Sequence, residues 1–328
     1  MFACGLCTTL VASLCLQLVS GLLGAGFSRN TRSMSSALNA WTGGKDAFVK
    51  YQGLGNDFIL VDNRGSNEPI YTPAQAVKLC DRNFGIGGDG LIFALPGEKG
   101  CDYTMRIYNS DGTEPQMCGN GIRCMAKFLQ LIESNNNAEI VYKIWTNAGV
   151  IVPKITADGL IAVDMGEPVL QAEKVPTRLS ATLDGAAVES PITVAGKEYK
   201  ATAVSMGNPH SVIFVDNLET MDPSFSTVGP LVERHVDFPE KVNAEFVQVV
   251  DRSHVIMKVW ERGAGATLAC GTGACAVVVA GVLSGRTERQ CTVTLPGGDL
   301  EIFWAEDNKV YMTGPAKEVF SGTLDPTI

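Results

Sequence analysis

The sequence has only three histidines in 328 residues and no cluster of lysine and arginine. Zinc sites use His and closely spaced cysteines. The pairs Cys118/Cys124 and Cys270/Cys275 are too far apart along predicted helices to share one metal, so we expect no metal. Because the net charge is −9 and nucleic-acid binding needs clustered basic residues, we also expect no nucleic-acid partner and no binding to anionic membranes.

Acidic residues are absent from the first 45 positions, and the first one is Asp46. Residues 10–27 are largely apolar and end in small residues, and a basic, hydroxyl-rich segment follows. This pattern predicts a targeting leader over residues 1–45 that is removed from the mature protein. Such a two-part leader resembles those that direct proteins into plastids bounded by extra membranes. The apolar run is marginal for a membrane anchor, so we expect a plastid stroma protein with no membrane contact.

Three of the ten cysteines fall in this leader. The other seven are an odd number at irregular spacing, which is not typical of a secreted disulfide framework. We therefore expect free thiols in a reducing compartment. The seven are Cys80, Cys101, Cys118, Cys124, Cys270, Cys275 and Cys291.

Two of these cysteines open glycine-containing turns that lead into apolar segments. Residues 270–273 read Cys-Gly-Thr-Gly and precede ten residues without a charge or an amide side chain. Residues 118–121 read Cys-Gly-Asn-Gly and precede a helical pattern that Arg123 and Lys127 interrupt. A helix that is apolar on every side is buried, and its N-terminus favours an anion. A thiol placed there is expected to have a pKa of roughly 3.5–7.5 instead of about 8.5.

The two cysteine turns belong to an internal repeat. Asn56 precedes Cys118 by 62 residues, and Asn208 precedes Cys270 by 62 residues. A polar side chain, Asn109 or Glu261, stands nine residues before each cysteine. The spacing predicts two homologous half-domains that face each other and each offer a helix N-terminus with a cysteine.

Two facing thiols suit the inversion of a carbon beside a carboxylate. Inversion needs a base on one face of the carbon and an acid on the other. The developing charge needs preorganised donors, and backbone N–H groups at Gly119-Asn120 and Gly271-Thr272 are candidates. A thiol-based redox sensor, with Cys118 and Cys270 as its switch, is the alternative from a different class.

Four segments resemble the diaminopimelate epimerase family. They are GLGNDF, NSDGTEPQMCGNGIRC, SMGNPH and ERGAGATLACGTGACA, and the resemblance runs from about Phe48 to the end. It implies conversion of LL-2,6-diaminopimelate to the meso form in lysine biosynthesis, with no cofactor. It also implies an α+β fold of two pseudo-symmetric domains, each a mixed β-sheet or barrel around a central buried helix, and a homodimer. We place the half-domains at residues 48–162 and 163–315, with 316–328 joining the first.

The resemblance also implies roles for individual residues. Cys118 and Cys270 are the acid/base pair, usually written as donor and acceptor, and His210 lies beside them. A carboxylate at the far end of the substrate suits Arg262 with asparagine side chains, and an ammonium suits Glu261. The residues expected to contact the substrate are Asn56, Asn109, Gly119, Asn120, Asn208, Asn243, Glu261, Arg262, Gly271 and Thr272.

The chain departs from many bacterial members at two positions. It has Ala266 where they carry an acidic residue and Gly90 near the place of a glutamine. A pocket contact near Gly90 is therefore not among the expected substrate contacts. Within the same fold, a proline or hydroxyproline racemase is the alternative. Glu261, Arg262 and the asparagines favour a longer substrate with a second charged end.

Overall fold

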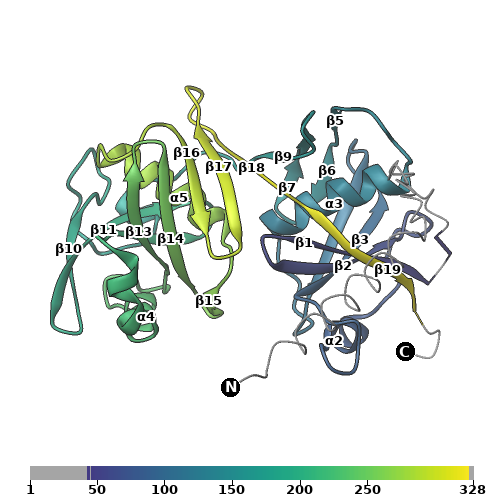
Figure 1. Cartoon of the computed structure of the whole chain (residues 1–328), viewed down its shortest axis with the longest axis horizontal. Coiled ribbons are helices and arrows are strands. Elements are labelled where there is room, and N and C mark those ends of the chain that lie inside the picture. The colour runs from purple at the N-terminus through teal and green to yellow at the C-terminus, as the bar shows by residue number, and fades with distance from the viewer. Residues whose placement is uncertain (1–42, 45, 325–328) are drawn as a thin grey trace, which may run out of the picture. The chain divides into compact units, whose positions relative to one another are not determined.

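The computed structural model describes residues 43–44 and 46–324, which belong to one compact unit, Ala40–Ile328. The predicted leader, apart from residues 43–44, lies outside the described residues, as do residues 325–328. The described part forms two mixed β-sheets and four α-helices (Figure 1). The helices are α2 (Pro73–Cys80), α3 (Gly119–Ile132), α4 (Leu218–Glu233) and α5 (Gly271–Leu283), and a 3-10 turn spans Ala172–Lys174.

The first sheet of the described residues has seven strands in the order β19, β1, β2, β3, β4, β6 and β7. The C-terminal strand therefore pairs with the first strand of the described chain. The bounds are β1 Ala47–Gly53, β2 Asn56–Asp62, β3 Gly90–Pro96, β4 Tyr103–Asn109, β6 Ile144–Thr146, β7 Gly149–Ile151 and β19 Lys317–Thr323.

The second sheet begins with the order β10, β11, β12, β13, β14, β16 and β17, continues through β18, β9, β8 and β5, and β15 pairs with β14. Its bounds are β5 Ile140–Val141, β8 Lys154–Ile155, β9 Ile161–Asp164, β10 Ser190–Val194, β11 Lys197–Ser205, β12 Pro209–Phe214, β13 Asn243–Asp251, β14 His254–Glu261, β15 Gly265–Thr267, β16 Gln290–Leu295, β17 Gly298–Trp304 and β18 Val310–Gly314. The expected domain boundary between residues 162 and 163 falls inside β9.

The predicted repeat is visible in the pairing pattern of the two sheets. Along β19–β1–β2–β3–β4–β6–β7 the pairs run antiparallel, antiparallel, parallel, antiparallel, parallel and antiparallel. The pairs along β10–β11–β12–β13–β14–β16–β17 follow the same sequence. Helices α3 and α5 follow the corresponding strands β4 and β14. The two halves are thus pseudo-symmetric, as the 62-residue spacing predicts.

Helix α5 is buried because its sequence leaves no polar face toward water, whereas α3 keeps Lys127 and Gln130 on a partly exposed face. In α5 the residues from Gly273 to Gly281 are all buried, and the helix contacts β11, β12, β13, β16, β17 and β18. In α3 the buried face includes Ile122, Met125 and Phe128, and the helix contacts β1, β2 and β3. Figure 1 shows α5 behind the strands of the second sheet and α3 against the first. Burial on this scale stabilises the fold by about 25 cal/mol per Å² of apolar surface.

Helix α2 shows how local sequence sets an element's start. Thr72 is its N-cap and forms a capping box with Gln75, and Pro73 stands at its first position. The sequence predicts a short helix over residues 73–79, and the structure confirms it with one further residue.

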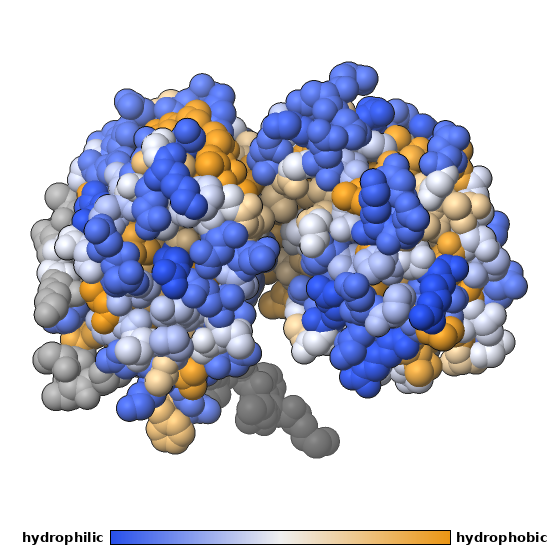
Figure 2. Space-filling view, turned by 180° about the vertical axis from the view of Figure 1, so that it is seen from behind, coloured by the Kyte–Doolittle hydropathy of each residue, from blue (hydrophilic) through white to orange (hydrophobic). Residues whose placement is uncertain are grey.

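The face of the molecule in Figure 2 is mainly hydrophilic, with apolar residues in separate patches. The most exposed large apolar side chains among the described residues are Phe84, at 92%, and Val236, at 68%. Isolated exposed apolar residues of this kind are normal. In the described part of the chain, no helix is both long and apolar enough to cross a membrane.

Candidate active site

Cys118 and Cys270 occupy the N-cap positions of α3 and α5, where the sequence predicts them. Their backbones are extended, with φ −135° and ψ 119° at Cys118 and φ −129° and ψ 106° at Cys270. The Cys118 sulfur accepts the N–H of Gly121 at 3.4 Å, whereas Cys270 makes no side-chain cap bond. Both thiols are free, as are the other five cysteines of the described chain.

The two helix starts lie against one side chain, Met312. A Cβ atom built on Gly271 would lie 2.9 Å from the Met312 sulfur, and one on Gly119 would lie 3.4 Å from the Met312 methyl carbon. Glycine at 271 therefore allows the close approach of helix and methionine. The Glu261 carboxylate also acts electrostatically on both thiols, which places all three groups in one region.

Amide groups surround Cys118. The thiol donates to Asn56 Oδ1 at 3.8 Å, and Asn120 Nδ2 donates to the same oxygen at 3.1 Å. The Asn56 amide nitrogen in turn donates to Asp89 at 2.7 Å, which fixes the amide orientation. Asn56, Cys118 and Asn120 thus lie together, while Asp89 is a supporting residue that the sequence analysis missed.

Cys270 has different neighbours. Its sulfur lies 3.6 Å from the hydroxyl of Thr272. A ring nitrogen of His210, a carboxylate oxygen of Glu245 and this sulfur all lie within 4.8 Å of one another. His210 Nδ1 lies 2.6 Å from Glu245 Oε1, and its Nε2 lies 3.0 Å from Asn208 Oδ1. His210 and Glu245 are fully buried, and the second oxygen of Glu245 has no hydrogen-bond partner.

Burial raises the pKa of both cysteines, which corrects the expected lowering at a helix N-terminus. At Cys118 the N–H groups of Gly121 and Asn120 and the charge of Arg123 oppose this rise in pKa. At Cys270 the carboxylates of Glu261 and Glu245 add to the burial, and the pKa rises well above its usual value. Burial also raises the pKa of Glu245, against the opposing effect of His210. The cost of burying charge thus exceeds the favourable helix terminus in the ligand-free protein.

Three further predicted residues, Asn243, Glu261 and Arg262, form hydrogen bonds with residues other than the cysteines. Asn243 is buried, but its side chain is occupied by the Pro209 carbonyl and the Arg262 N–H, both at 2.9 Å. The Arg262 guanidinium donates to the carbonyl of Glu240 at the exposed surface. Glu261 accepts a hydrogen bond from Thr267.

Asn109 and Gly90 both lie on the first sheet. The predicted Asn109 amide donates to the Thr113 hydroxyl at 3.0 Å. At Gly90, a Cβ atom would lie 2.8 Å from the carbonyl oxygen of Tyr108, so the backbone here leaves no space for a side chain.

Two fully buried charged residues near the cysteines were not predicted as site residues. Arg123 interrupts the apolar pattern of α3, and Glu245 stands among the apolar residues of β13. A charged residue inside an otherwise buried element is the signal that would have found them, since such residues are rarely buried without a partner.

His210, Glu245 and Cys270 are also the one group in the described residues that could hold a metal ion. Imidazole, carboxylate and thiolate are zinc ligands, and three of them leave a fourth position open. The sequence predicts no metal. The same three groups can also transfer protons.

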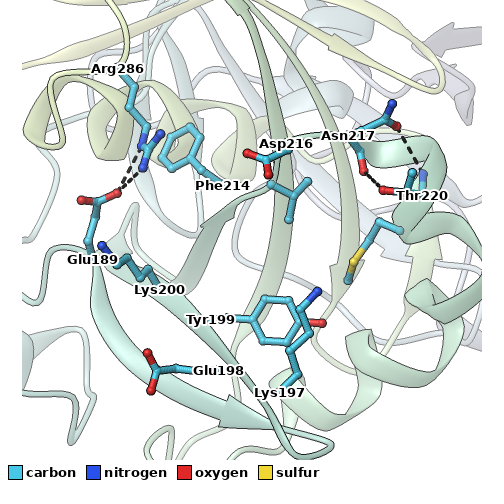
Figure 3. Close-up of a pocket in the computed structure, with 12 residues that line it drawn as sticks. Glu189, Lys197, Glu198, Tyr199, Lys200, Phe214, Asp216, Asn217, Thr220 and Arg286 are labelled. Atoms are coloured by element: carbon cyan, nitrogen blue, oxygen red, sulfur yellow. Dashed lines mark hydrogen bonds and ion pairs between the residues drawn. The ribbon is translucent and has the colours of Figure 1, made fainter.

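A separate cavity of about 400 Å³ lies beside β11, β12 and the start of α4 (Figure 3). Figure 3 shows Arg286 paired with Glu189 beside the ring of Phe214, and Asn217 bonded to Thr220. None of the predicted site residues lines it. This cavity is therefore separate from the candidate active site at the two helix N-termini.

Comparison with solved structures defines the class of fold. The predicted epimerase PA4716 from Pseudomonas aeruginosa matches with a TM-score of 0.58 and 15% identity over 85% of this chain and 99% of its own. A hydroxyproline epimerase from Agrobacterium vitis matches with a TM-score of 0.56 and 15% identity over 85% and 92%. At these identities the likeness shows the fold alone, a two-domain fold that these proteins share with this chain.

Sequence comparison defines the family. The family model named "Diaminopimelate epimerase" matches residues 48–171 and 202–319. Diaminopimelate epimerase of Synechocystis is 60% identical over 85% of this chain and 99% of its own length. The chloroplastic diaminopimelate epimerase of Oryza sativa subsp. japonica is 58% identical over 84% and 79%. The chain belongs to the diaminopimelate epimerase family.

Proposed function

We propose that the protein epimerises LL-2,6-diaminopimelate to meso-2,6-diaminopimelate in lysine biosynthesis, using Cys118 and Cys270 as its two bases. The observation that carries this proposal is the pair of N-cap cysteines on pseudo-symmetric helices. The first glycine of each helix lies against Met312, and Glu261 acts on both thiols. Relatives at 56–60% identity bear the name diaminopimelate epimerase.

In the reaction, one cysteine is a thiolate and removes the α-proton, while the other is a thiol and donates a proton to the opposite face. The Cα–H bond breaks at one sulfur, its electron pair passes to the α-carbon and carboxylate, and the S–H bond of the second thiol supplies the new α-proton. The product differs only in configuration, and the roles of the two cysteines are exchanged. No redox step or cofactor is needed.

The negative charge that develops on the reacting carboxylate needs donors. N–H groups at the first turn of a helix have no intrahelical partner and point toward such an anion. We assign this role to the N–H groups of Gly119 and Asn120 on α3 and of Gly271 and Thr272 on α5. One such donor is worth about 3–4 kcal/mol of transition-state stabilisation.

The raised pKa of each thiol has a consequence for this step. A thiolate with a high pKa is a strong base, and the substrate's ammonium group brings positive charge into the buried site. Substrate binding therefore favours the ionised form of one cysteine. His210, held between Asn208 and Glu245 close to Cys270, is the supporting residue for proton movement at this thiol.

The second end of the substrate carries another carboxylate and another ammonium group. We assign the carboxylate to Arg262 with asparagine side chains, and the ammonium to Glu261. The exposed guanidinium of Arg262 bonds only a backbone carbonyl in the structure, so it is available to a carboxylate.

We further propose that the protein works in the plastid as a homodimer. The plastid location rests on the acid-free leader sequence and on the chloroplastic rice relatives. The division into half-domains at residues 48–162 and 163–315, with 316–328 joining the first, is part of the same proposal. The pairing of β19 with β1 supports the last point.

Incubation with LL-diaminopimelate in deuterated buffer tests the reaction. We expect meso product that carries one deuterium at the inverted α-carbon, measured by NMR and mass spectrometry. Proline and 4-hydroxyproline, incubated in parallel, should gain no label. Labelled proline without labelled diaminopimelate would replace the proposal with a racemase of the same fold, and no label in any substrate would refute it.

A further inference from the structure

Arg123 is a fully buried cation below the Cys118 half of the site. It lies on the first turns of α3, five residues after the N-cap cysteine, and its side chain is 0% exposed. Arginine is almost never buried to this extent without a partner. The proposed function gives this side chain no role.

The guanidinium contacts neutral groups. Its Nε donates to the carbonyl of Pro315 at 3.2 Å, and its Nη1 donates to the carbonyl of Gly119 at 3.2 Å. Its Nη2 donates to Asn120 Oδ1 at 2.9 Å, and Nη1 lies 3.7 Å from the Met312 sulfur. No carboxylate pairs with it among the described residues. The hydrogen bonds hold the guanidinium in place but leave its charge uncompensated.

Two glycines shape the space around the guanidinium. A Cβ atom on Gly53 of β1 would lie 3.0 Å from Arg123 Nη2, and one on Gly314 of β18 would lie 3.4 Å from Nε. Glycine at both positions leaves room for a planar group that bridges the two sheets. The space is therefore fitted to an arginine.

A buried charge without a partner is costly, so an anion nearby is favoured. The ionisable groups that face Arg123 are the thiols of Cys118, Cys124 and Cys275. Hydrogen bonds join the guanidinium to Cys118, since Arg123 Nη2 donates to Asn120 Oδ1 at 2.9 Å and the Asn120 amide and the Cys118 thiol both donate to Asn56 Oδ1. Burial raises the pKa of Cys124 and of Cys275 to about 12, so Cys118 is the group placed to supply the negative charge.

The charged groups that face Cys118 are Arg123, which favours the thiolate, and Glu261, which opposes it. The Cys270 thiol faces two carboxylates, Glu261 and Glu245, and both oppose its thiolate. Arg123 thus distinguishes the two halves of the site.

We propose that Arg123 is the buried counter-ion that stabilises the thiolate of Cys118, and so acts as a positioning residue for charge in the active site. The inference rests on the proposed two-cysteine function, in which one thiol must be ionised. Arg123 acts through Cys118 and through the amide of Asn120, and touches no substrate.

The test is the pH dependence of alkylation at Cys118. Wild-type protein and the variants Arg123→Met, Arg123→Lys and Lys127→Met are treated with iodoacetamide from about pH 7 to about pH 12, and the labelled Cys118 and Cys270 peptides are quantified by mass spectrometry. The midpoint of each profile is compared, because the midpoint reports ionisation whereas the rate also reports access. Lys127→Met is the matched control, since it also removes a cation from α3. The Lys127 side chain is partly buried and donates to Gln130, away from the cysteine.

We expect Arg123→Met to raise the Cys118 midpoint by about 1–3 pH units, the range for loss of a close opposite charge. Arg123→Lys and Lys127→Met should leave it within a few tenths of a unit. A structural role alone would predict equal damage from the lysine and methionine variants at position 123. An unchanged Cys118 midpoint in folded Arg123→Met protein would overturn the proposal.

A second measurement covers the case in which Arg123→Met does not fold. The ultraviolet thiolate band is followed against pH in Cys270→Ser and in Cys118→Ser, each after subtraction of the double variant. The thiolate of Cys118 should form at lower pH than that of Cys270, and the reverse order refutes the proposal. Neither measurement uses substrate, so a failed epimerase assay would leave the assignment of Arg123 standing.

Discussion

The two halves of the active site share a backbone and differ in their charges. Each half places a cysteine at the N-cap of a buried helix that follows a corresponding strand. Around Cys118 lie two amide side chains and the cation of Arg123. Around Cys270 lie a hydroxyl, an imidazole and the carboxylates of Glu245 and Glu261.

The comparison shows that the repeated fold determines the positions of the two thiols, whereas the individual side chains around them determine their basicity. The duplicated fold supplies two opposed proton-transfer groups, which is the geometry that inversion needs. The unequal surroundings make the two thiols unequal in basicity, so Cys118 is the easier of the two to ionise. The buried thiols within the two helices, Cys124 and Cys275, do not share the asymmetry, because burial raises the pKa of both to about 12.

Replacing the cysteines one at a time should have the largest effect on activity and should show how the two halves differ. Cys118→Ser and Cys270→Ser should each lower the rate of epimerisation by at least about 10²–10⁴-fold, because each removes one of two acid/base groups. Deuterium exchange should separate the variants, since each remaining cysteine can exchange the α-proton on its own face only. We expect Cys118→Ser and Cys270→Ser to exchange opposite isomers, measured by NMR on LL and meso substrate.

A redox sensor that uses the same two cysteines would behave differently. If the two cysteines were only a redox switch, the activity of the protein would survive in both serine variants. The activity of the wild-type protein would then respond to oxidant. Retention of more than a tenth of the wild-type rate in either variant would contradict the two-base mechanism.

The next comparison uses the third residue of each central helix, which is a glycine. A Cβ atom on Gly273 would lie 2.9 Å from Glu245 Oε1 and 3.2 Å from the Cys270 sulfur, whereas one on Gly121 would meet the end of Ile92 at 3.1 Å. A terminal methyl can move aside, but the Glu245 oxygen is held by His210. We expect Gly273→Ala to lower the free energy of unfolding by about 1–3 kcal/mol.

Gly121→Ala is the matched control for that variant. Alanine also favours a helix by up to about 1 kcal/mol over glycine, so Gly121→Ala should be close to neutral. Urea unfolding at pH 7 measures both variants. An equal loss of stability in both would mean that the two helix starts are packed alike, against the geometry at Glu245.

Much of this architecture can be predicted from the sequence because it is local or repeated. The glycine turns and the apolar run after Cys270 identify the buried helices, and the 62-residue spacing identifies the pseudo-symmetry. The resemblance to the family names most of the residues that lie near the thiols. These features depend on periodicity and motif, which the chain displays directly.

The electrostatics could not be predicted in the same way. The low pKa expected for the thiols followed from the helix terminus alone. The depth of burial, which raises the pKa, depends on three-dimensional packing that the sequence does not display. Glu245 lies 35 residues from His210 in the chain, and Arg123 reaches the carbonyl of Pro315 across 192 residues. Contacts at such separations leave no periodic signal in the sequence.

The smallest expected effect compares one carboxyl group from each half as the pH changes. Asp57 of β2 pairs with Lys50 and Arg82, each at 2.7 Å. Burial acts to raise its pKa, but hydrogen bonds from these cations lower it to about 2. Glu245 is the opposite case, because burial exceeds the effect of His210 and raises its pKa.

The two groups should therefore give stability profiles of opposite slope. For Asp57 the unfolded chain binds more protons, so its contribution is present above its unfolded pKa of about 4 and is lost as the pH falls toward 2. Asp57→Asn should cost about 1–2 kcal/mol at pH 7, discounted for partial exposure, and progressively less toward pH 2. For Glu245 the folded protein binds more protons, so wild type should lose stability relative to Glu245→Gln as the pH rises above about 4. Urea unfolding of the three proteins between pH 3 and 7 measures both slopes, and parallel slopes would mean that the Glu245 charge is compensated in the fold.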